Sequence, residues 1–421
     1  MILLLITFAA FLSYWNNFFK VTYKDFFETH QNRSEQLVLD GILHGSDGSN
    51  RLKLGRYFRP NLEENHQNPR ELYSEKNKDG EFREYKSQFG LQVYLFSFLA
   101  ETFDRDVRFL HAFTAFLMSL IVGLFFIAVQ REFSLIHAVF FTIPLIVSPW
   151  VVVFARNLYW IEATWFLPTV ITLMYGKRAF TSTRGALLMG FMLFAAFLLK
   201  FLCGYEYLTT IGLSACVPLA YFARQYHHGF KGGFIQFIIC GSSLMLAFVF
   251  AIFLHTQALS SDSSASLNTI KLIAEKRLSS SNPELLAKEY CKDSPNPEEC
   301  EEQFLLDYGK SLTANRFHVA ATYFKMREFL PWIDSDMNNS GNIFLFFILI
   351  VCIMALKRKD SLSFALLISF LAPLSWFTLA KGHSYLHTNL NYVLWFLPYV
   401  PIGMLILSPQ KIPRWNKRAK K

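Results

Sequence analysis

Residues 20–107 decide the architecture, and two stretches within them carry the information: NRSEQLVLDGILHG (32–45) and EYKSQFGLQVYLFSFLAETF (84–103). This polar block separates a first apolar stretch, residues 1–18, from the next one, residues 107–130. The second quoted stretch is apolar and aromatic, but it is shorter than the roughly 20 residues that a membrane-spanning helix needs. We therefore predict a long polar loop that ends in a juxtamembrane helix, and we place the candidate active site in this loop.

The composition is that of a polytopic membrane protein. Hydrophobic residues make up 52% of the 421 residues and charged residues only 17%, with 45 Phe. Several apolar runs reach the roughly 20 residues that cross a bilayer as a helix. These runs lack the alternation typical of membrane barrels, and helices satisfy their own backbone polar groups in lipid. The predicted fold class is therefore an all-α polytopic membrane protein.

We predict about ten transmembrane helices. They cover residues 1–18, 107–130, 133–153, 159–176, 185–203, 206–223, 233–255, 342–356, 361–380 and 390–408. Alternate short loops and the tail KIPRWNKRAKK carry most of the positive charge, which marks that side as cytoplasmic. Counting back from the tail places both termini inside and the two long loops, residues 20–106 and 256–341, outside. Because the net charge of +9 gathers at span ends, we do not expect a nucleic-acid partner.

This topology divides the chain into three parts. Residues 1–255 form a transmembrane core that includes the outer loop 20–106. Residues 256–341 form an outer helical cap, because three amphipathic segments follow a Ser-rich start and the loop is too long for a mere connection. Residues 342–421 form a three-span segment with a basic cytoplasmic tail. In the cap, Cys291 and Cys300 bracket KDSPNPEE. They form a disulfide if the loop faces an oxidising compartment, and otherwise remain free thiols.

The motifs of the common soluble enzymes are absent from the sequence: GxSxG, HExxH, GxxxxGK[ST] and the Rossmann glycines do not occur. Chemistry must therefore come from loops and span ends. The first candidate group is the carboxylate pair Glu35 and Asp40 in the first loop. Such carboxylates act as a general base or bind a divalent cation through oxygen ligands. The alternative is that both are solvated acids of a polar loop.

Two further groups lie at the outer ends of the middle spans. Arg156 and Glu162 stand among aromatic residues, and charges so close to hydrocarbon usually have a partner or a task. The alternative is an interfacial aromatic belt in which Arg156 snorkels. Lys200 and Glu206 end one span and begin the next. They form an ion pair that closes the turn, or Lys200 binds a lipid phosphate as a point charge.

The fourth group is the turn before the last span, which carries Lys381, His383 and His387. A turn so rich in donors suits a phosphate or a sugar. It is not a zinc signature, because local spacing supplies no third ligand for the two histidines. The alternative is a polar turn that caps two helices. All four groups fall on the outer face of the predicted topology, which favours one shared site.

This layout resembles the GT-C class of integral-membrane glycosyltransferases. The resemblance rests on the N-terminal span, the acidic outer loop and the helix entered through YKSQFGLQVYLFSF (85–98). FARNLYWIEATWFLP (154–168) also resembles the part of that class in which an outer Arg and an acid follow the third span. The sequence departs from the commonest pattern, because Ser34 and Glu35 stand where an adjacent acidic pair is expected.

The resemblance implies that a sugar leaves a polyprenyl-phosphate carrier and passes to a glycan, lipid or protein acceptor at the periplasmic face. It implies that Glu35 does the acid–base or metal-linked work, with a divalent cation left open as a cofactor. Basic residues near the outer surface then hold the lipid phosphate: Arg156, Lys200 or Lys381. The expected location is a bacterial inner membrane.

Two other functions remain open from the sequence. The large late loop fits a polymerase or ligase of the O-antigen type, whereas the large first loop favours the glycosyltransferase. A membrane transporter is the third alternative. Transporters with inverted repeats carry charges in the middle of the membrane, and here the charges gather at span ends.

Overall fold

The computed structural model describes residues 1–46, 51–59, 68–103, 106–227, 230–259, 262–278, 282–292, 294, 296–326, 329 and 340–409. Within these ranges the chain is helical apart from one two-stranded antiparallel sheet, in which Gly55 pairs with Glu84. The elements are α1 (Ile2–Asn16), α2 (Lys24–Thr29), α3 (Asn32–Gly45), β1 (Gly55–Phe58), α4 (Pro69–Ser74), β2 (Glu81–Glu84), α5 (Leu91–Thr102), α6 (Val107–Glu132), α7 (Leu135–Val147), α8 (Pro149–Ala155), α9 (Ala163–Thr181), α10 (Thr183–Cys203), α11 (Leu208–His227), α12 (Phe230–Leu259), α13 (Ser263–Leu278), α14 (Pro283–Cys291), α15 (Pro297–Thr313), α16 (Arg316–Thr322), α17 (Ser340–Arg358), α18 (Ser361–Leu379), α19 (Lys381–Leu386), α20 (Thr388–Asn391), η1 (Tyr392–Phe396) and α21 (Tyr399–Leu407).

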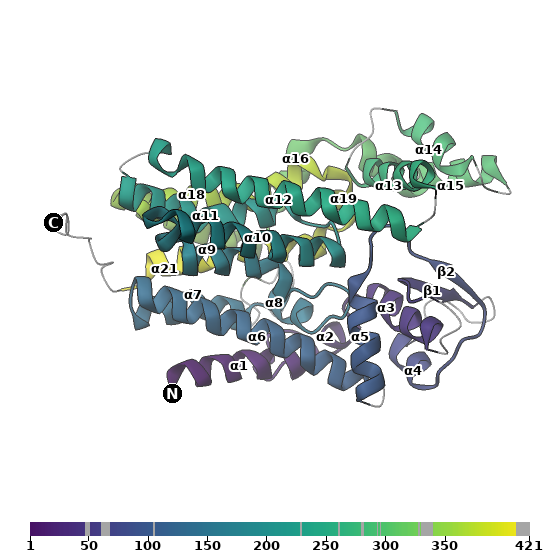
Figure 1. Cartoon of the computed structure of the whole chain (residues 1–421), viewed down its shortest axis with the longest axis horizontal. Coiled ribbons are helices and arrows are strands. Elements are labelled where there is room, and N and C mark those ends of the chain that lie inside the picture. Colours follow the sequence, from purple (N-terminus) through teal and green to yellow (C-terminus); the bar gives the residue numbers. More distant parts are fainter. Residues whose placement is uncertain are drawn as a thin grey trace.

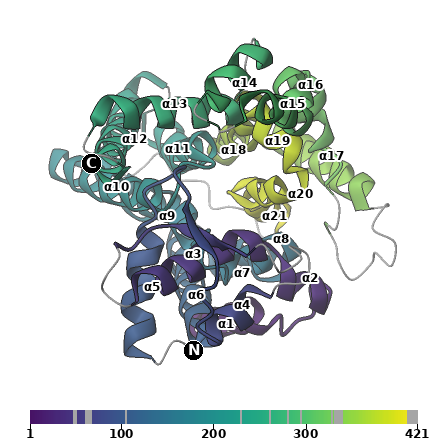
Figure 2. The same ribbon diagram turned by 90° about the vertical axis from the view of Figure 1, so that its right-hand side faces the viewer.

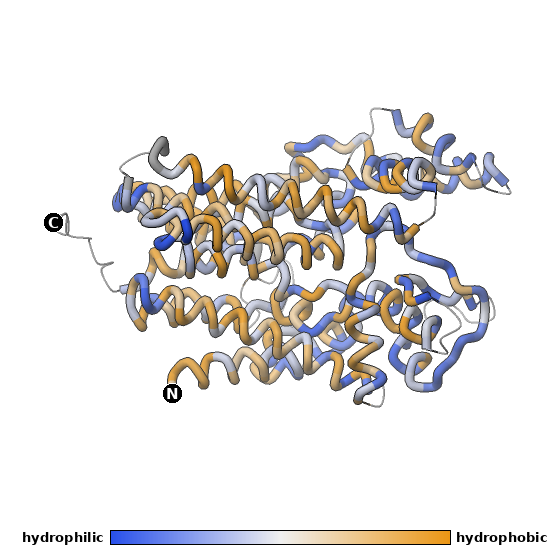
Figure 3. The backbone as a smooth tube through the Cα atoms, in the orientation of Figure 1, coloured by the Kyte–Doolittle hydropathy of each residue, from blue (hydrophilic) through white to orange (hydrophobic). Residues whose placement is uncertain are grey.

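The long apolar helices run side by side and form most of the molecule (Figure 1). Figure 3 shows that these helices are mainly hydrophobic along their length, whereas the right-hand end is mainly hydrophilic. On α12, large apolar side chains point outward, including Leu246 at 62% exposure and Val249 at 60%. Such a surface is unfavourable in water and suits contact with lipid. The predicted all-α membrane fold is confirmed at this level.

The structure supports fewer membrane spans than the sequence predicts. Among the described residues, four helices are long and apolar enough to cross a membrane: α6, α10, α12 and α18. Two bent pairs, α7 with α8 and residues 388–396 with α21, raise the number to six if each pair is one span. By length and composition, the described helices therefore give four to six spans and not the predicted number of about ten. One reason is that α1 has only 15 residues.

Two predicted continuous spans are in fact broken. The apolar run 133–153 bends by 70° between α7 and α8. Ser148 ends α7, and its hydroxyl accepts a hydrogen bond from the amide of Val151 at 3.3 Å, which caps α8. Pro149 then occupies the first turn of α8, where its missing N–H costs nothing. The last run bends by 43° between residues 388–396 and α21.

The polar elements gather at one end of the helix bundle. The sheet, α3 and α4 from the first long loop lie there, and so do α13, α14 and α15 from the second (Figure 1). The N-terminus and the end of α21 lie at the opposite end (Figure 1). Helix α5 crosses the ends of the long helices instead of running with them (Figure 1), and Phe98 on it is 68% exposed. At 12 residues α5 is too short to span a membrane, and its juxtamembrane position stays a prediction.

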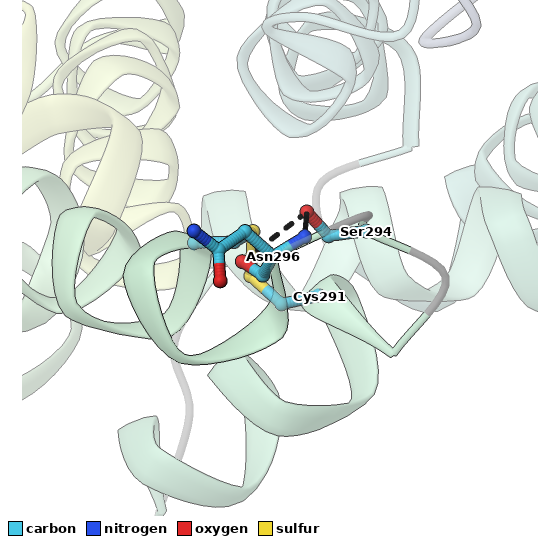
Figure 4. The surroundings of a disulfide bond; sticks show 4 residues. Cys291, Ser294 and Asn296 are labelled. Carbon is cyan, nitrogen blue, oxygen red and sulfur yellow. Dashed lines mark hydrogen bonds between the residues drawn. A yellow bond between two sulfur atoms is a disulfide. The ribbon is translucent and has the colours of Figure 1, made fainter.

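The cap helices have a small hydrophobic core of their own, separate from the main core. It includes Leu286, Phe304 and Leu312, with Cys291 buried among them. A disulfide joins Cys291 to Cys300, beside a turn in which the amide of Asn296 donates to the hydroxyl of Ser294 at 3.4 Å (Figure 4). Of the two alternatives predicted for these cysteines, the structure therefore contains the disulfide.

Candidate functional site

A cavity of about 970 Å³ lies at the polar end of the molecule, where three parts of the chain meet. Figure 2, which faces this end, shows α3 of the first loop, α13 of the cap and α19, and each of these helices carries residues that line the cavity. The first loop contributes Gln31, Arg33, Ser34, Leu37, Arg56, Tyr85 and Lys86; the cap contributes Lys276, Arg277, Tyr290 and Tyr308; the ends of the long helices contribute Tyr159, Trp160, Glu206, His383 and His387. The lining is therefore rich in cations and aromatic rings.

Arg277 connects all three parts. It lies in the last turn of α13, and its Nη1 donates to Oε1 of Glu206 at 2.7 Å while its Nη2 donates to the hydroxyl of Tyr85 at 2.7 Å. Burial alone would lower the pKa of Arg277 and raise the pKa of Glu206, which disfavours both charges. However, Tyr85 and Glu206 raise the pKa of Arg277, and Arg277 followed by Lys200 lowers the pKa of Glu206. Both groups are therefore ionised at neutral pH.

Glu206 sits on a tight turn between α10 and α11. Lys200, which is buried, donates from Nζ to the carbonyl oxygen of Gly204 at 2.5 Å. A Cβ atom at Gly204 would lie 2.5 Å from Oε2 of Glu206 and 2.7 Å from Oε1 of Gln88, so a larger residue there would displace both side chains. Lys200 does not line the cavity. It supports the turn that presents Glu206, and the phosphate role predicted for it has no geometric support here.

Lys276 places an amine in the cavity wall next to Arg277. Its Nζ lies 4.1 Å from the ring centroid of Tyr308 and 4.9 Å from that of Tyr290. Burial and the neighbouring charge of Arg277 lower the pKa of Lys276 to about 8. The amine is thus mostly protonated at pH 7 and can bind an anion as a point charge.

The two histidines predicted to bind phosphate both line the cavity. His383 lies on α19 and His387 follows its last residue, with the two ring centroids 4.8 Å apart. Burial is the largest cause that lowers the pKa of each imidazole, and the positive charge of Arg277 adds to it. Both are therefore neutral at pH 7, which makes them proton acceptors and not phosphate counter-charges.

Lys381, the third residue of that turn, points elsewhere. Its Nζ donates to the carbonyl oxygen of Ala314, at 2.9 Å, and caps the end of α15. The next residue, Gly382, packs directly against the last turn of α13, since a Cβ there would lie 2.9 Å from the carbonyl oxygen of Arg277. The turn thus holds the cap in place as well as lining the cavity.

Glu35 lies on a different face of α3 from the residues that line this cavity. Its side chain is 2% exposed, and Oε1 accepts from Nε of Arg70 at 3.0 Å and lies 2.8 Å from Nε2 of His111. Burial alone would raise the pKa of Glu35, but His111 and Arg70 lower it to about 2. A carboxylate with so low a pKa is a weak general base at neutral pH. The catalytic role predicted for Glu35 stays a prediction.

Asp40 is enclosed by protein donors. Its Oδ1 accepts from Nη2 of Arg59 at 3.2 Å, and both side chains are 2% exposed. Its Oδ2 accepts from the amide of Tyr57 at 3.0 Å and from Gln36 at 3.1 Å. These bonds hold β1 against α3 and surround the buried carboxylate with protein donors. The described residues contain no group of three or more His, Cys, Asp or Glu that could hold a metal ion, and a divalent cation stays open.

Arg156 and Glu162 also lie apart from the large cavity. Nη2 of Arg156 donates to the carbonyl oxygen of Phe27 and to Oε2 of Glu28, each at 2.9 Å. Glu28 also accepts from Arg70, so Arg156 is linked to Glu35 through a chain of ion pairs. Glu162 is fully buried, and neither of its carboxylate oxygens has a hydrogen-bond partner among the described residues.

The structure therefore divides the predicted site residues instead of collecting them. Glu206, His383 and His387 meet at the large cavity. Glu35 and Arg156 belong to one ion-pair network. The sequence did not single out Arg277, Lys276 or Tyr85, although the basic end of the amphipathic segment TIKLIAEKRL (269–278) was a visible signal.

Comparison of the sequence and structure with protein-family models, with curated proteins and with solved structures gives no match. The cavity and the side chains that line it are therefore the basis for assigning a function. They supply fixed cations, neutral imidazoles and aromatic rings at the point where the apolar helices end.

Proposed function

We propose that the protein is a membrane glycosyltransferase that moves a sugar from a polyprenyl-phosphate donor to a glycan, lipid or protein acceptor. The observation that carries the proposal is the cavity of about 970 Å³, in which Lys276 and Arg277 lie beside aromatic rings and two neutral imidazoles. A lipid-linked donor presents its phosphate where the hydrocarbon ends, and this is where the cavity lies. The resemblance to the GT-C class agrees with this placement.

We further propose ten spans, with the cavity on the periplasmic side of a bacterial inner membrane. Helices α1, α9 and α11 run alongside the long helices (Figure 1), and α17 packs against α18 and α21. With the four long helices and the two bent pairs they make ten. Basic residues in the last turns of α9 and α17, including Arg178 and Arg358, favour a cytoplasmic position for that end. The Cys291–Cys300 disulfide favours an oxidising compartment for the cap.

The lining residues suggest how transfer would proceed. An acceptor hydroxyl attacks the anomeric carbon of the sugar, and the bond from that carbon to the phosphate oxygen breaks. The electron pair leaves with the phosphate, whose charge Arg277 and Lys276 stabilise in a site of low dielectric. The acceptor proton passes to the imidazole of His387, which lines the cavity. Trp160 and Tyr85 offer ring faces and edges to the sugar.

Glu35 has a positioning role in this proposal. Its bonds to Arg70 and His111 fix one face of α3 against α4 and α6. The opposite side of α3 presents Ser34 and Leu37 to the cavity. A shift of α3 would therefore change the shape of the cavity wall.

The test is sugar transfer by purified protein in nanodiscs, supplied in turn with a panel of polyprenyl-phosphate sugars. We expect one donor to be consumed, and we expect His387→Ala to lower turnover by roughly a hundredfold with little change in the Michaelis constant for the donor. His318→Ala is the matched control, because His318 is exposed on α16 and does not line the cavity. If folded protein consumes no donor, the polymerase, ligase and transporter functions gain weight.

A second prediction concerns the compartment. Peptide mapping of protein from intact cells, alkylated without reduction, should recover Cys291 and Cys300 as one linked peptide pair. The reason is that a disulfide in the cap persists only where the cap faces an oxidising compartment. Alkylation of both thiols without reductant would place the cap on the reducing side and would contradict the proposed orientation.

A further inference from the structure

A second cavity, of about 660 Å³, lies at the boundary of the apolar helices. Its lining includes Trp15 and Asn16, the last two residues of α1, and Val107 and Arg108, the first two of α6. Trp15 is 38% exposed. Tryptophan at the end of an apolar helix is typical of the membrane–water interface. The cavity therefore opens at the height at which phospholipids present their headgroups.

A cation with unused donors lies deep in this cavity. The side chain of Arg156 is 7% exposed and packs over the ring of Phe27, with its Cζ 3.8 Å from the centroid. Only Nη2 of Arg156 is bonded, to Phe27 and Glu28; its Nε and Nη1 donate to no group among the described residues. Glu28 is shared with Arg70. A buried guanidinium that shares its only carboxylate with another arginine, and that has N–H groups without an acceptor among the described residues, can bind an anionic oxygen group.

Carboxylates surround the same cavity nearer the solvent. Glu71, in the first turn of α4, and Glu75, which follows its last residue, lie one turn apart; both are exposed, and both line it. Asp106 lines it as well, but it is paired with Arg108 at 3.4 Å. A purely anionic ligand would be repelled by Glu71 and Glu75, whereas a ligand with a phosphate at one end and an ammonium at the other satisfies both charges.

We propose that this cavity binds the headgroup of a membrane phospholipid that carries a phosphate and a primary ammonium, as phosphatidylethanolamine does. The phosphate lies on Arg156 and the ammonium lies between Glu71 and Glu75. The volume falls within the range of small-molecule sites. The inference does not depend on the proposed sugar transfer, because none of these residues lines the larger cavity.

The test measures lipids retained by the protein, with native mass spectrometry after exchange into nanodiscs of defined composition. We expect phosphatidylethanolamine to be retained about tenfold over phosphatidylglycerol, and we expect Glu71→Gln/Glu75→Gln to remove that preference. Arg156→Gln should weaken retention of both lipids. Glu81→Gln is the control, because Glu81 is 73% exposed on β2 and does not line the cavity.

Two outcomes would overturn the proposal. One is equal retention of both lipids with no effect of the double variant, which would indicate a site for anions only. The other is that soluble glycerophosphoethanolamine binds whereas phosphatidylethanolamine in the nanodisc is not retained, which would exclude a membrane lipid as the source. The exposed positions of Glu71 and Glu75 keep the test valid even if Arg156→Gln does not fold.

Discussion

Arg277→Met should lower sugar transfer by at least about a hundredfold, because it removes two charge-assisted hydrogen bonds and a cation from the donor cavity. The two bonds, to Glu206 and to Tyr85, are each 2.7 Å long. The variant also leaves Glu206, which is buried, beside Lys200 alone as a source of positive charge. Donor titrations should show a raised Michaelis constant together with lower turnover.

The control for this variant lies on the same helix. Lys271 is 73% exposed on α13, and the ion pair that it forms with Glu275 is long, at 3.9 Å. Lys271→Met should therefore transfer sugar at the wild-type rate. Arg277→Lys should recover part of the activity, because it keeps the charge but not both bonds. Wild-type transfer by Arg277→Met would show that the cavity is not the donor site.

A double-mutant cycle separates the two functions of Arg277. If Arg277 acts mainly by holding Glu206, the double variant Arg277→Met/Glu206→Gln should transfer sugar no worse than Arg277→Met. If Arg277 contacts the donor phosphate, Glu206→Gln alone should retain much more activity than Arg277→Met. Limited proteolysis within the cap reports independently whether α13 has come loose.

The features that could be predicted from the sequence are those that depend on local pattern. That α5 is a helix of only 12 residues agrees with an apolar run too short to span a membrane. The Cys291–Cys300 bond joins residues only nine apart along the chain. The placement of both long loops at one end follows from the order of the apolar runs.

What could not be predicted depends on contacts between distant residues. Arg277 and Tyr85 are 192 residues apart, and Arg277 and Glu206 are 71 apart. Neither pair can be recognised from hydrophobic periodicity, because that pattern indicates which residues share one face of a helix and not which distant side chains meet. Asp40 shows the same limit: it looks like a catalytic acid until Arg59, 19 residues later, is placed against it.

Breaks within apolar runs are a third case. The bend at Ser148 and Pro149 carries a local signal, since Ser followed by Pro favours the start of a turn or helix. The flanking residues are uniformly apolar, and hydrophobicity alone therefore favours one continuous span. The bend matters for the site, because it brings the end of α8, and Arg156 after it, back against Phe27 and Glu28.

Glu35→Gln should lower the free energy of unfolding at pH 7 by roughly 1–3 kcal/mol, because it removes a buried carboxylate that accepts a charge-assisted hydrogen bond from Arg70. The folded pKa lies below the unfolded one. The contribution is therefore fully present above pH 4.5 and is lost as the pH falls toward 2. Wild type and variant should accordingly differ at pH 7 and converge near pH 2. The measurement is unfolding in detergent, followed at both pH values, with Glu101→Gln as the control because Glu101 is exposed on α5.

The same variant distinguishes a positioning carboxylate from a catalytic one. If Glu35 positions α3, sugar transfer should fall in parallel with stability, and Arg70→Met should cause a similar loss of both, because Arg70 binds the same oxygen at 3.0 Å. A Glu35→Gln protein with wild-type stability but no transfer would contradict the positioning role. In that case Glu35 itself would be the proton acceptor, as the resemblance to GT-C enzymes implies, and His387 would lose that assignment.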